Sequence, residues 1–302
     1  MTTTVENGGN NPPERLAAQK RLSNIFVKRK NSNMTEMDNK DLRKRFNPDG
    51  SILRKQQLRM VEMLAELDRI CKKHGIRYWL IGGTLLGAAR HKGFIPWDDD
   101  MDVQMLREDY SRLMDILPNE LPANLTIQNR QTDPNYFYQY AKLRDRRSHL
   151  EEGLGYDRVF REHGIFIDIF PIDRHPKFLQ RLSMATIGHC YKLLKNKSLS
   201  DKEIMKRVMR IVHVNEKVIY PLFRLVSNVA KTEYYLDAFG VPYIVERYME
   251  DIFPLSSMEF EGQYFPVPHD TDKVLRDQYG DYMKLPNLNN ISTHASKISI
   301  ED

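Results

Sequence analysis

The sequence predicts an α+β fold, in which a small mixed sheet in the first half of the chain is followed by helices in the second half. Two observations support this prediction. Short apolar or alternating runs bounded by turn residues recur between positions 77 and 170, as is typical of strands. Beyond Pro171 the apolar residues instead recur at three- and four-residue steps, which indicates helices.

Each element follows from apolar spacing and from the Gly and Pro residues between the runs. The helix over 55–73 has apolar residues at helical spacing and is stopped by Gly75. Residues 100–105 alternate between polar and apolar side chains, whereas 165–170 is an apolar run with one acidic residue. In chain order the predicted elements are helix 55–73, strand 77–81, helix 84–91, strand 100–105, helix 107–117, strands 125–128, 136–144 and 165–170, helices 177–195, 200–217, 221–230 and 243–249, a Pro-rich segment 265–268, and helix 271–279.

Charge is distributed unevenly along the 302 residues, although the net charge is only +5. Residues 1–55 carry a net charge of +6 and residues 177–231 a net charge of +9, so the rest of the chain sums to −10. We therefore predict three regions: a disordered basic leader (1–45), a catalytic core (46–176), and a helical region with a C-terminal closing segment (177–302).

The two cysteines lie 119 positions apart, which excludes a disulfide framework and a cysteine-based zinc cluster. The sequence has no secretory signal and no apolar stretch of bilayer length near the acidic and glycine-rich motifs. We expect a cytoplasmic protein, with peripheral contact at the inner face of the membrane as a further expectation.

A Gly82-Gly83-Thr84 turn follows an apolar strand and opens a short helix. Glycines at this point let backbone N–H groups approach an anion, and a helix N-terminus adds partial positive charge. A Gly-Gly turn after a strand is also compatible with a simple turn, so this motif alone leaves both interpretations open.

Four carboxylates then occur within five residues, at Asp98, Asp99, Asp100 and Asp102. Two residues apart on a strand, Asp100 and Asp102 point to the same face, while Asp99 points away. Such clustering favours a hard divalent cation, although a solvated acidic loop is the usual fate of charge runs. Trp97, Met101 and Val103 give this segment a face to bury and favour the metal interpretation.

Asp168 adds a third candidate carboxylate, because it lies inside the apolar run 165–170. A buried ionised group needs a cation or a hydrogen-bonding partner, whereas an edge-strand position would leave it in solvent. Carboxylates from two neighbouring strands would hold Mg²⁺ or Mn²⁺ against a phosphate-containing substrate. Cationic side chains should face the same substrate, and the candidates are Arg90, Lys142, Arg144 and Arg146. A surface salt bridge is equally compatible with each of them.

Together these motifs resemble the LicD family, which is related to fukutin and fukutin-related protein and has the nucleotidyltransferase superfold of DNA polymerase β type. The resemblance covers about residues 55–286. It is carried by the segments 82–91 (GGTLLGAARH), 95–102 (IPWDDDMD), 142–145 (KLRD), 166–171 (FIDIFP) and 279–286 (YGDYMKLP). The sequence is thereby identified as a member of this family.

The resemblance implies transfer of a phospho-alcohol group, phosphocholine first, from CDP-choline or another CDP-alcohol to a glycan hydroxyl, with release of CMP. The expected acceptors are precursors of lipopolysaccharide, teichoic acid or capsule. Asp100, Asp102 and Asp168 would be the catalytic metal ligands, with Asp98 as a supporting ligand. Gly82, Gly83 and Thr84 would cradle the donor phosphates, with Arg90, Lys142 and Arg144 as further donor contacts.

Three alternatives stay open from the sequence. One is a ribitol-phosphate-type transferase, another is a nucleotidyltransferase acting on a small molecule or sugar phosphate, and the third is a non-catalytic glycan-assembly protein. An aromatic cage for choline could come from Tyr136, Phe137, Tyr138 and Tyr140, which also suit ordinary packing. His91 fits a helix-capping role better than a proton shuttle.

The basic helix over 200–217 suits either an anionic membrane surface or packing on the catalytic core with a solvated basic face. A lipid-linked glycan acceptor would be found at such a surface. No recognised motif supports nucleic-acid binding.

Overall fold

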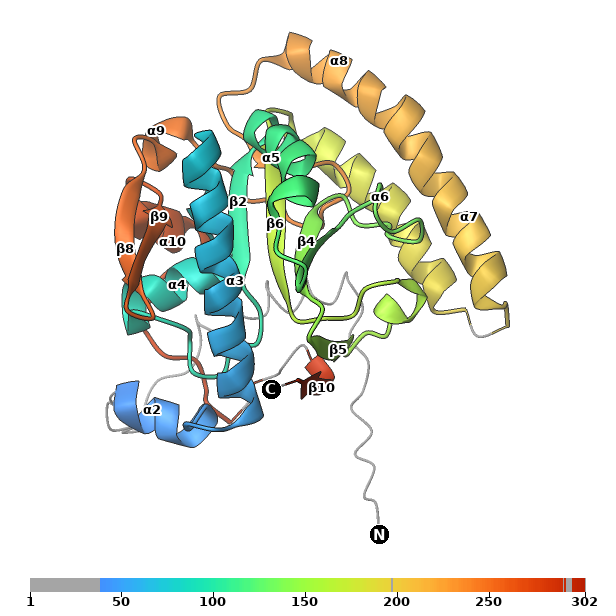
Figure 1. The fold of residues 1–302 in the computed structure, drawn as a ribbon. Helices are drawn as coiled ribbons and strands as arrows, with labels where there is room; N and C mark the ends of the chain where they lie inside the picture. The colour runs from blue at the N-terminus through green and yellow to red at the C-terminus, as the bar shows by residue number, and fades with distance from the viewer. Residues whose placement is uncertain (1–38, 197, 290, 292–294, 302) are drawn as a thin grey trace.

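The computed structural model describes residues 39–301, apart from 197, 290 and 292–294. Its centre is a mixed sheet in the order β1-β2-β6-β4-β3, with β7 paired to the C-terminal end of β6. Figure 1 labels the central strands β2, β6 and β4. β2 and β6 run parallel, and the other neighbours in this sheet are antiparallel. The strands are β1 (Trp79–Leu80), β2 (Asp102–Leu106), β3 (Leu125–Gln128), β4 (Ala141–Asp145), β6 (Phe166–Asp173) and β7 (Leu236–Asp237).

Three helices in the first half of the chain position the sheet. They are α3 (Ile52–His74), α4 (Gly82–His91) and α5 (Arg107–Glu120). Ser51 caps the first turn of α3 by accepting a hydrogen bond from the Arg54 N–H, and Gly75 ends the helix in the left-handed conformation. The apolar face of α3 packs into the main core with β1, β2 and β6, which fixes the sheet edge where the acidic run begins.

A second layer of helices covers the other side of the sheet in Figure 1. α6 (Lys177–Leu194) packs against α7 (Asp201–Val214), which continues through a π-helical turn (Asn215–Ile219) into α8 (Tyr220–Ala230). A capping box between Ser200 and Glu203 starts α7. Pro221 cannot donate a backbone hydrogen bond, which accounts for the irregular turn before α8. None of the helices in the described part of the chain is long and apolar enough to cross a membrane.

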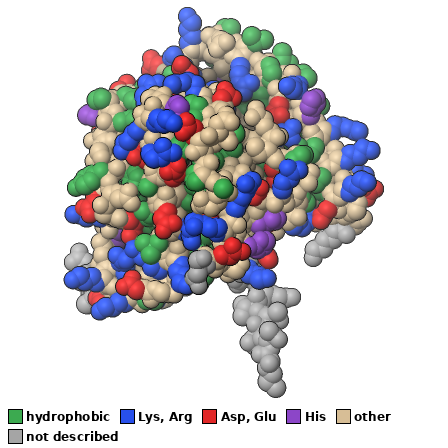
Figure 2. Space-filling model, viewed as in Figure 1, with side chains coloured by type: hydrophobic (Ala, Val, Ile, Leu, Met, Phe, Trp, Pro, Cys, Tyr) green, Lys and Arg blue, Asp and Glu red, His purple; other side chains and the backbone are tan. Residues whose placement is uncertain are grey.

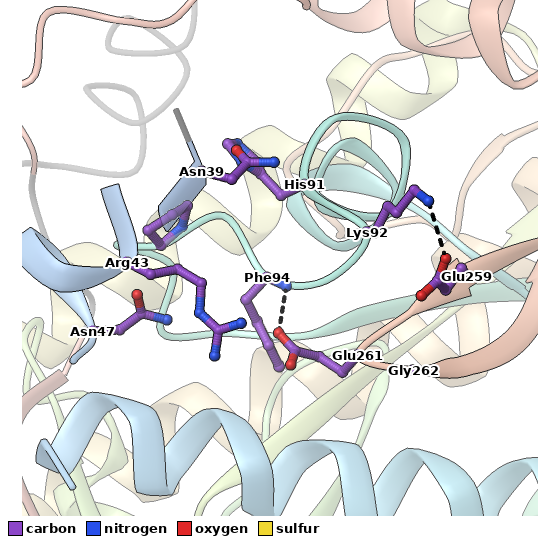
Figure 3. Close-up of a pocket in the computed structure, with 10 residues that line it drawn as sticks. Asn39, Arg43, Asn47, His91, Lys92, Phe94, Glu259, Glu261 and Gly262 are labelled. Carbon is purple, nitrogen blue, oxygen red and sulfur yellow. Dashed lines mark hydrogen bonds and ion pairs between the residues drawn. The ribbon is translucent and has the colours of Figure 1, made fainter. Parts of the chain in front are cut away.

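The C-terminal part of the described chain packs against elements from its N-terminal half. α9 (Met249–Ile252) leads to a hairpin of β8 (Ser256–Phe260) and β9 (Gln263–Val267), followed by α10 (Thr271–Tyr279). β10 (Ala295–Ile300) pairs with β5 (Ser148–Glu152), and a 3₁₀ turn (Asp157–Val159) follows β5. A cavity of about 320 Å³ lies between α2 (Asn39–Phe46), the end of α4 and the β8–β9 hairpin (Figure 3).

The α+β class and most elements agree with the sequence prediction, but four predictions were wrong in detail. The strand predicted over 136–144 begins only at Ala141, because Tyr136 and the adjacent Phe137 both pack into a second hydrophobic cluster and break the alternation. No helix spans 243–249; an isolated bridge joins Tyr235 to Arg247 instead. The Pro-rich segment 265–268 lies mostly in β9, and the region 177–302 also contributes three further strands that were not predicted.

Helix α2 falls partly within the segment predicted as a disordered leader, and residues 1–38 lie outside the described part of the chain. Leu42 is buried and so fixes α2 on the protein.

Both cysteines, Cys71 and Cys190, are buried as free thiols. In the face drawn in Figure 2, Lys and Arg side chains gather over α7, and hydrophobic side chains are visible along α8.

Candidate active site

Three predicted site residues lie in one row across the centre of the sheet. Asp102 on β2 is paired in register with Asp168 on β6, and Asp168 is paired with Lys142 on β4. Residues paired directly across neighbouring strands point to the same face of a sheet. The fold therefore brings a carboxylate, a second carboxylate and an ammonium group side by side.

Lys142 is the immediate partner of Asp168. Its Nζ donates to Asp168 Oδ1 at 2.8 Å, and its side chain is buried almost completely. Burial raises the pKa of Asp168 to about 6, while the neighbouring ammonium of Lys142 opposes that shift. Asp168 is thus the buried strand carboxylate that the sequence predicted, and its partner in the described structure is a lysine.

The start of the acidic run, Asp98–Asp100, lies in a loop, and side chains of α3 hold the backbone of this loop in place. Gln56 Nε2 donates to the backbone oxygen of Asp99 at 2.6 Å, and Gln57 Nε2 donates to the backbone oxygen of Asp98 at 2.9 Å. Asp100 precedes β2, so the loop, and not a continuous strand, places it near Asp102. Both glutamines are buried and bring their amides to this loop.

Asp98 is buried among other carboxylates of the acidic run. Burial raises its pKa well above the usual value, and the carboxylates of Asp100, Asp99 and Asp102 raise it further. Its Oδ2 atom is buried without a hydrogen-bond partner. Asp100 also raises the pKa of Asp168, so the four predicted carboxylates act on one another. Such mutual repulsion is relieved by a proton or by a cation.

The glycine turn approaches these carboxylates directly. Gly82 has a φ of +61°, and a Cβ atom there would lie 2.9 Å from Asp102 Oδ2. A Cβ atom at Gly83 would lie 2.7 Å from Asp98 Oδ2. Thr84 Oγ1 accepts a hydrogen bond from the backbone N–H of Asp102 at 2.9 Å, which ties α4 to the start of β2. The glycines therefore leave room for carboxylate oxygens at the helix N-terminus.

Replacing Gly83 by Ala is expected to lower any catalytic activity of this site about a hundredfold, because the new methyl group displaces the Asp98 carboxylate. Gly188→Ala, within α6, is the control, since a Cβ atom there meets nothing within 4 Å. This control should keep full activity and gain about 0.5–1 kcal/mol of stability. Steady-state kinetics and urea unfolding of both variants test the prediction. Equal activities would separate Asp98 from the active site.

The other predicted cations occupy different environments. Arg90 donates to the backbone oxygens of Tyr282 and Lys284 and to His91, and burial lowers its pKa to about 10. Arg144 is fully buried and donates to Gln128, Gly164 and Glu152, so its guanidinium supports the fold. Exposed Arg146 contacts Thr126 and Glu162. Lys142 is thus the basic residue that reaches the carboxylate row.

Comparisons with known proteins show the family to which the chain belongs. A family model described as LicD/FKTN/FKRP, nucleotidyltransferase domain, matches residues 75–222. The lipopolysaccharide cholinephosphotransferase LicD of Haemophilus influenzae is 31% identical over 252 residues, which cover 78% of this chain and 92% of that protein. The chain belongs to the LicD family. The human ribitol 5-phosphate transferase FKRP is 63% identical over 35 residues, which cover 12% of this chain and 7% of FKRP.

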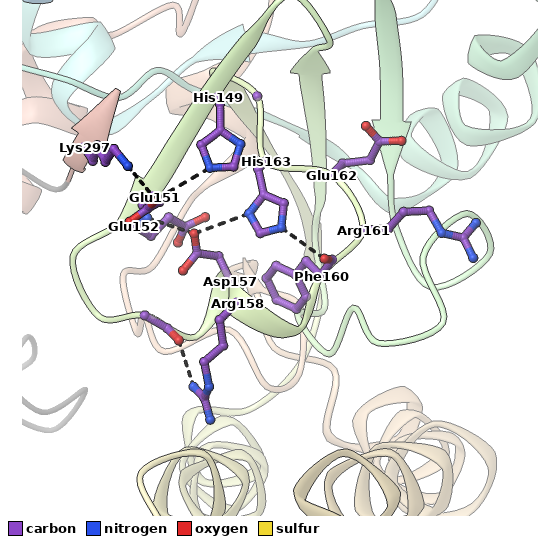
Figure 4. A network of polar contacts seen from close by, with 12 residues as sticks. His149, Glu151, Glu152, Asp157, Arg158, Phe160, Arg161, Glu162, His163 and Lys297 are labelled. Atoms are coloured by element: carbon purple, nitrogen blue, oxygen red, sulfur yellow. Dashed lines mark hydrogen bonds and ion pairs between the residues drawn. The ribbon is translucent and has the colours of Figure 1, made fainter. Parts of the chain in front are cut away.

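Two residues of this LicD-family site were missed by the sequence analysis. Glu152 lies 3.5 Å from Lys142 Nζ and 3.2 Å from an Arg144 nitrogen, and so joins both cations. Its backbone N–H donates to Asp157, in the network around β5 shown in Figure 4. Burial raises the pKa of Tyr279 on α10, and the nearby carboxylates of Asp102, Asp98 and Asp100 raise it further. The sequence gave no signal for Glu152, whereas Tyr279 is the first residue of the segment 279–286, one of those that carry the family resemblance.

The aromatic residues near Lys142 divide into two groups. Tyr136 and Phe137 are fully buried, as ordinary packing requires. Tyr138 and Tyr140 are half-buried and stack with ring centroids 5.2 Å apart, and both rings lie within 6 Å of the Lys142 ammonium. The second pair therefore forms an aromatic surface that already contacts a cation.

His91 has a structural role in the fold. Arg90 Nε donates to its Nε2 atom at 2.8 Å, and its Nδ1 lies 2.6 Å from Asn39 Oδ1. Burial lowers the pKa of His91 to about 4. His91 lines the cavity of Figure 3, which lies apart from the carboxylate row. It links α4 to α2 through Asn39, whereas the residue that caps the C-terminus of α4 is Lys92.

The oxygen atoms of this candidate site are of the kind that binds a hard cation. Among the described residues, no three His, Cys, Asp or Glu side chains form a group that could hold a metal ion as they stand. The partnerless Oδ2 of Asp98 and the mutual repulsion around it are the observations that fit a cation. Carboxylate oxygens are ligands that Mg²⁺ and Mn²⁺ accept.

Proposed function

We propose that this protein transfers a phospho-alcohol group, phosphocholine first, from a CDP-activated donor to a hydroxyl of a cell-surface glycan, with release of CMP. The observation that carries the proposal is the row of Asp102, Asp168 and Lys142 in a chain aligned over nearly the whole length of a lipopolysaccharide cholinephosphotransferase. The partial match to a ribitol 5-phosphate transferase supports the same class of reaction.

The carboxylates would hold the cofactor. Asp98, Asp100, Asp102 and Asp168 supply the hard oxygen ligands for Mg²⁺ or Mn²⁺. When bound, the ion would neutralise the diphosphate of the donor and stabilise the charge that develops on the leaving phosphate. Lys142 keeps Asp168 oriented on its strand through the 2.8 Å contact.

The turn at the start of α4 would receive the donor phosphates. Gly82 and Gly83 bring backbone N–H groups close to the carboxylates, and the Thr84 hydroxyl, which accepts from Asp102, still has a proton to donate. Arg90, at the other end of the same helix, ties α4 to the C-terminal segment by donating to the backbone oxygen of Tyr282. The stacked rings of Tyr138 and Tyr140 suit the quaternary ammonium of choline.

The bond changes follow from this placement. The acceptor hydroxyl oxygen forms a bond to the phosphorus that carries the alcohol, and the bond from that phosphorus to the bridging oxygen breaks. The bridging oxygen and its electron pair leave with CMP. Asp168, with a pKa raised to about 6 by burial, is ionised at neutral pH and would accept the hydroxyl proton.

Product analysis tests the proposal. The full chain is incubated with CDP-choline, and separately with CDP-ribitol, together with Mg²⁺ and a lipopolysaccharide preparation. We expect CMP release that depends on both the metal and the acceptor, and a higher unfolding temperature with the bound CDP-alcohol. Release of pyrophosphate from a nucleoside triphosphate, without CMP release from either CDP-alcohol, would instead indicate a nucleotidyltransferase. Absence of both reactions, with no donor binding, would favour a non-catalytic role.

A further inference from the structure

An exposed apolar stripe runs along the outer side of the helix that continues from α7 into α8. Its side chains recur at three- and four-residue steps, which places them on one face of a continuous helix. The exposed apolar stripe consists of Val214, Val218, Leu222, Leu225, Val226 and Val229. Val229 is 83% exposed and Leu225 is 63% exposed, so the stripe is open to solvent in the described chain.

The same helical segment also has an inner apolar face. Tyr220 and Ser227 are buried, and Tyr220 packs with Leu179 and Phe239 in a small cluster below α8. The inner face therefore already packs α8 on the protein. The stripe is a second apolar face that this packing does not use. An amphipathic surface helix normally has a polar outer face, so an apolar one indicates a partner.

The exposed charges beside the stripe are basic, and Arg224 also lies close enough to Asp173 to lower the pKa of that carboxyl group. Arg210, Lys217, Arg224 and Lys231 are all exposed on or at the end of this helical segment. The acidic residue between them, Glu216, is turned toward the protein, where it forms an ion pair with Arg130 at 3.3 Å and accepts a hydrogen bond from Gln139. An apolar surface bordered by cations is complementary to an anionic partner with an apolar interior.

We propose that the protein lies on an anionic lipid bilayer through the exposed apolar stripe. Valine and leucine side chains would enter the boundary between headgroups and acyl chains, while the four basic residues contact lipid phosphates. Pairing of two copies through the stripe would bring the basic borders together, which like-charge repulsion opposes. A bilayer satisfies both the apolar and the basic features.

The position of this surface differs from the one predicted from the sequence. The apolar side of the helix predicted over 200–217 is buried, because Ile204, Met205, Val208 and Val212 pack in the second hydrophobic cluster. Over most of its length that helix offers exposed basic residues, such as Lys206 and Arg207. The apolar contact would begin at its C-terminal end and continue along α8, over Val214–Val229.

Vesicle co-sedimentation of the full chain tests this proposal independently of enzymatic activity. The probes are phosphatidylcholine vesicles with and without phosphatidylglycerol. The variant is Leu225→Glu/Val229→Glu, and the control is Leu58→Glu/Tyr264→Glu, which changes two other exposed apolar residues and alters the net charge equally. Thermal unfolding confirms that both variants are folded.

We expect the parent protein and the control to bind the anionic vesicles and not the neutral ones. The stripe variant should bind about tenfold more weakly or worse, while it transfers phosphocholine to a soluble acceptor at the parent rate. Equal binding by the stripe variant and the control would overturn the proposal, as would absence of binding by the parent. A parent dimer that the stripe variant dissociates in sedimentation velocity would assign the stripe to a subunit interface instead.

Discussion

Replacement of Asp102 by Asn is expected to reduce the transfer rate about a thousandfold or more, which corresponds to about 4 kcal/mol of transition-state stabilisation. Asn has the same shape but lacks the negative charge that a divalent cation needs. The variant should stay folded, because Asp102 is one of the carboxylates that raise the pKa of buried Asp98. In the absence of metal, removal of that repulsion should leave the free energy of unfolding unchanged or slightly increased.

A buried carboxylate outside the cluster supplies the control. Asp237 on β7 lies against the far end of β6 and accepts a hydrogen bond from Gln104 at 2.8 Å. Asp237→Asn should keep most of the activity. Turnover is measured as CMP release, and binding of Mn²⁺ is measured separately by calorimetry. An Asp102→Asn protein with near-normal turnover would refute the ligand assignment, whereas lost turnover with intact metal binding would move Asp102 out of the metal site.

The sequence was sufficient to predict the two strands that carry Asp102 and Asp168. Alternation around the first and the apolar run around the second are local patterns, and both survive in the structure as β2 and β6. The helices α3 and α10 were also predicted, and Gly75 marks the end of the first of them. Local signals thus determined most of the framework of the site.

The register between strands could not be read from the sequence, because it depends on contacts between distant segments. Lys142 was one of several equivalent basic residues until the pairing of β4 with β6 placed it opposite Asp168. The strands β8 and β10 were missed because one is paired through a hairpin containing Pro and the other pairs with β5. The aromatic residues before Ala141 have the spacing of a strand in the sequence. In the structure, Tyr136 and the adjacent Phe137 are both buried in the second hydrophobic cluster, which a strand would not allow on one face.

Lys142→Met is expected to destabilise the protein by about 3–5 kcal/mol, because the buried Asp168 carboxylate then loses the ammonium group that neutralises it. Met preserves the length and the apolar stem of Lys142, so the change acts mainly on charge. The lost ammonium also contacts the Phe166 ring at 3.3 Å from its centroid. Without Lys142 the pKa of Asp168 should rise further above its value of about 6, since Lys142 is the neighbour that lowers it. Urea unfolding of the metal-free protein measures the loss.

Arg146→Met is the matched control, since the Arg146 ion pair with Glu162 lies at the surface and should contribute less than about 1 kcal/mol. The double variant Lys142→Met/Asp168→Asn should recover much of the stability lost in Lys142→Met, because it removes the buried charge together with its partner. Activity should stay lost in the double variant, which separates the structural role of Lys142 from the catalytic role of Asp168. If Lys142→Met were as stable as Arg146→Met, Asp168 would have to be neutralised by another group, and the row across β2, β6 and β4 would not be the electrostatic centre of the fold.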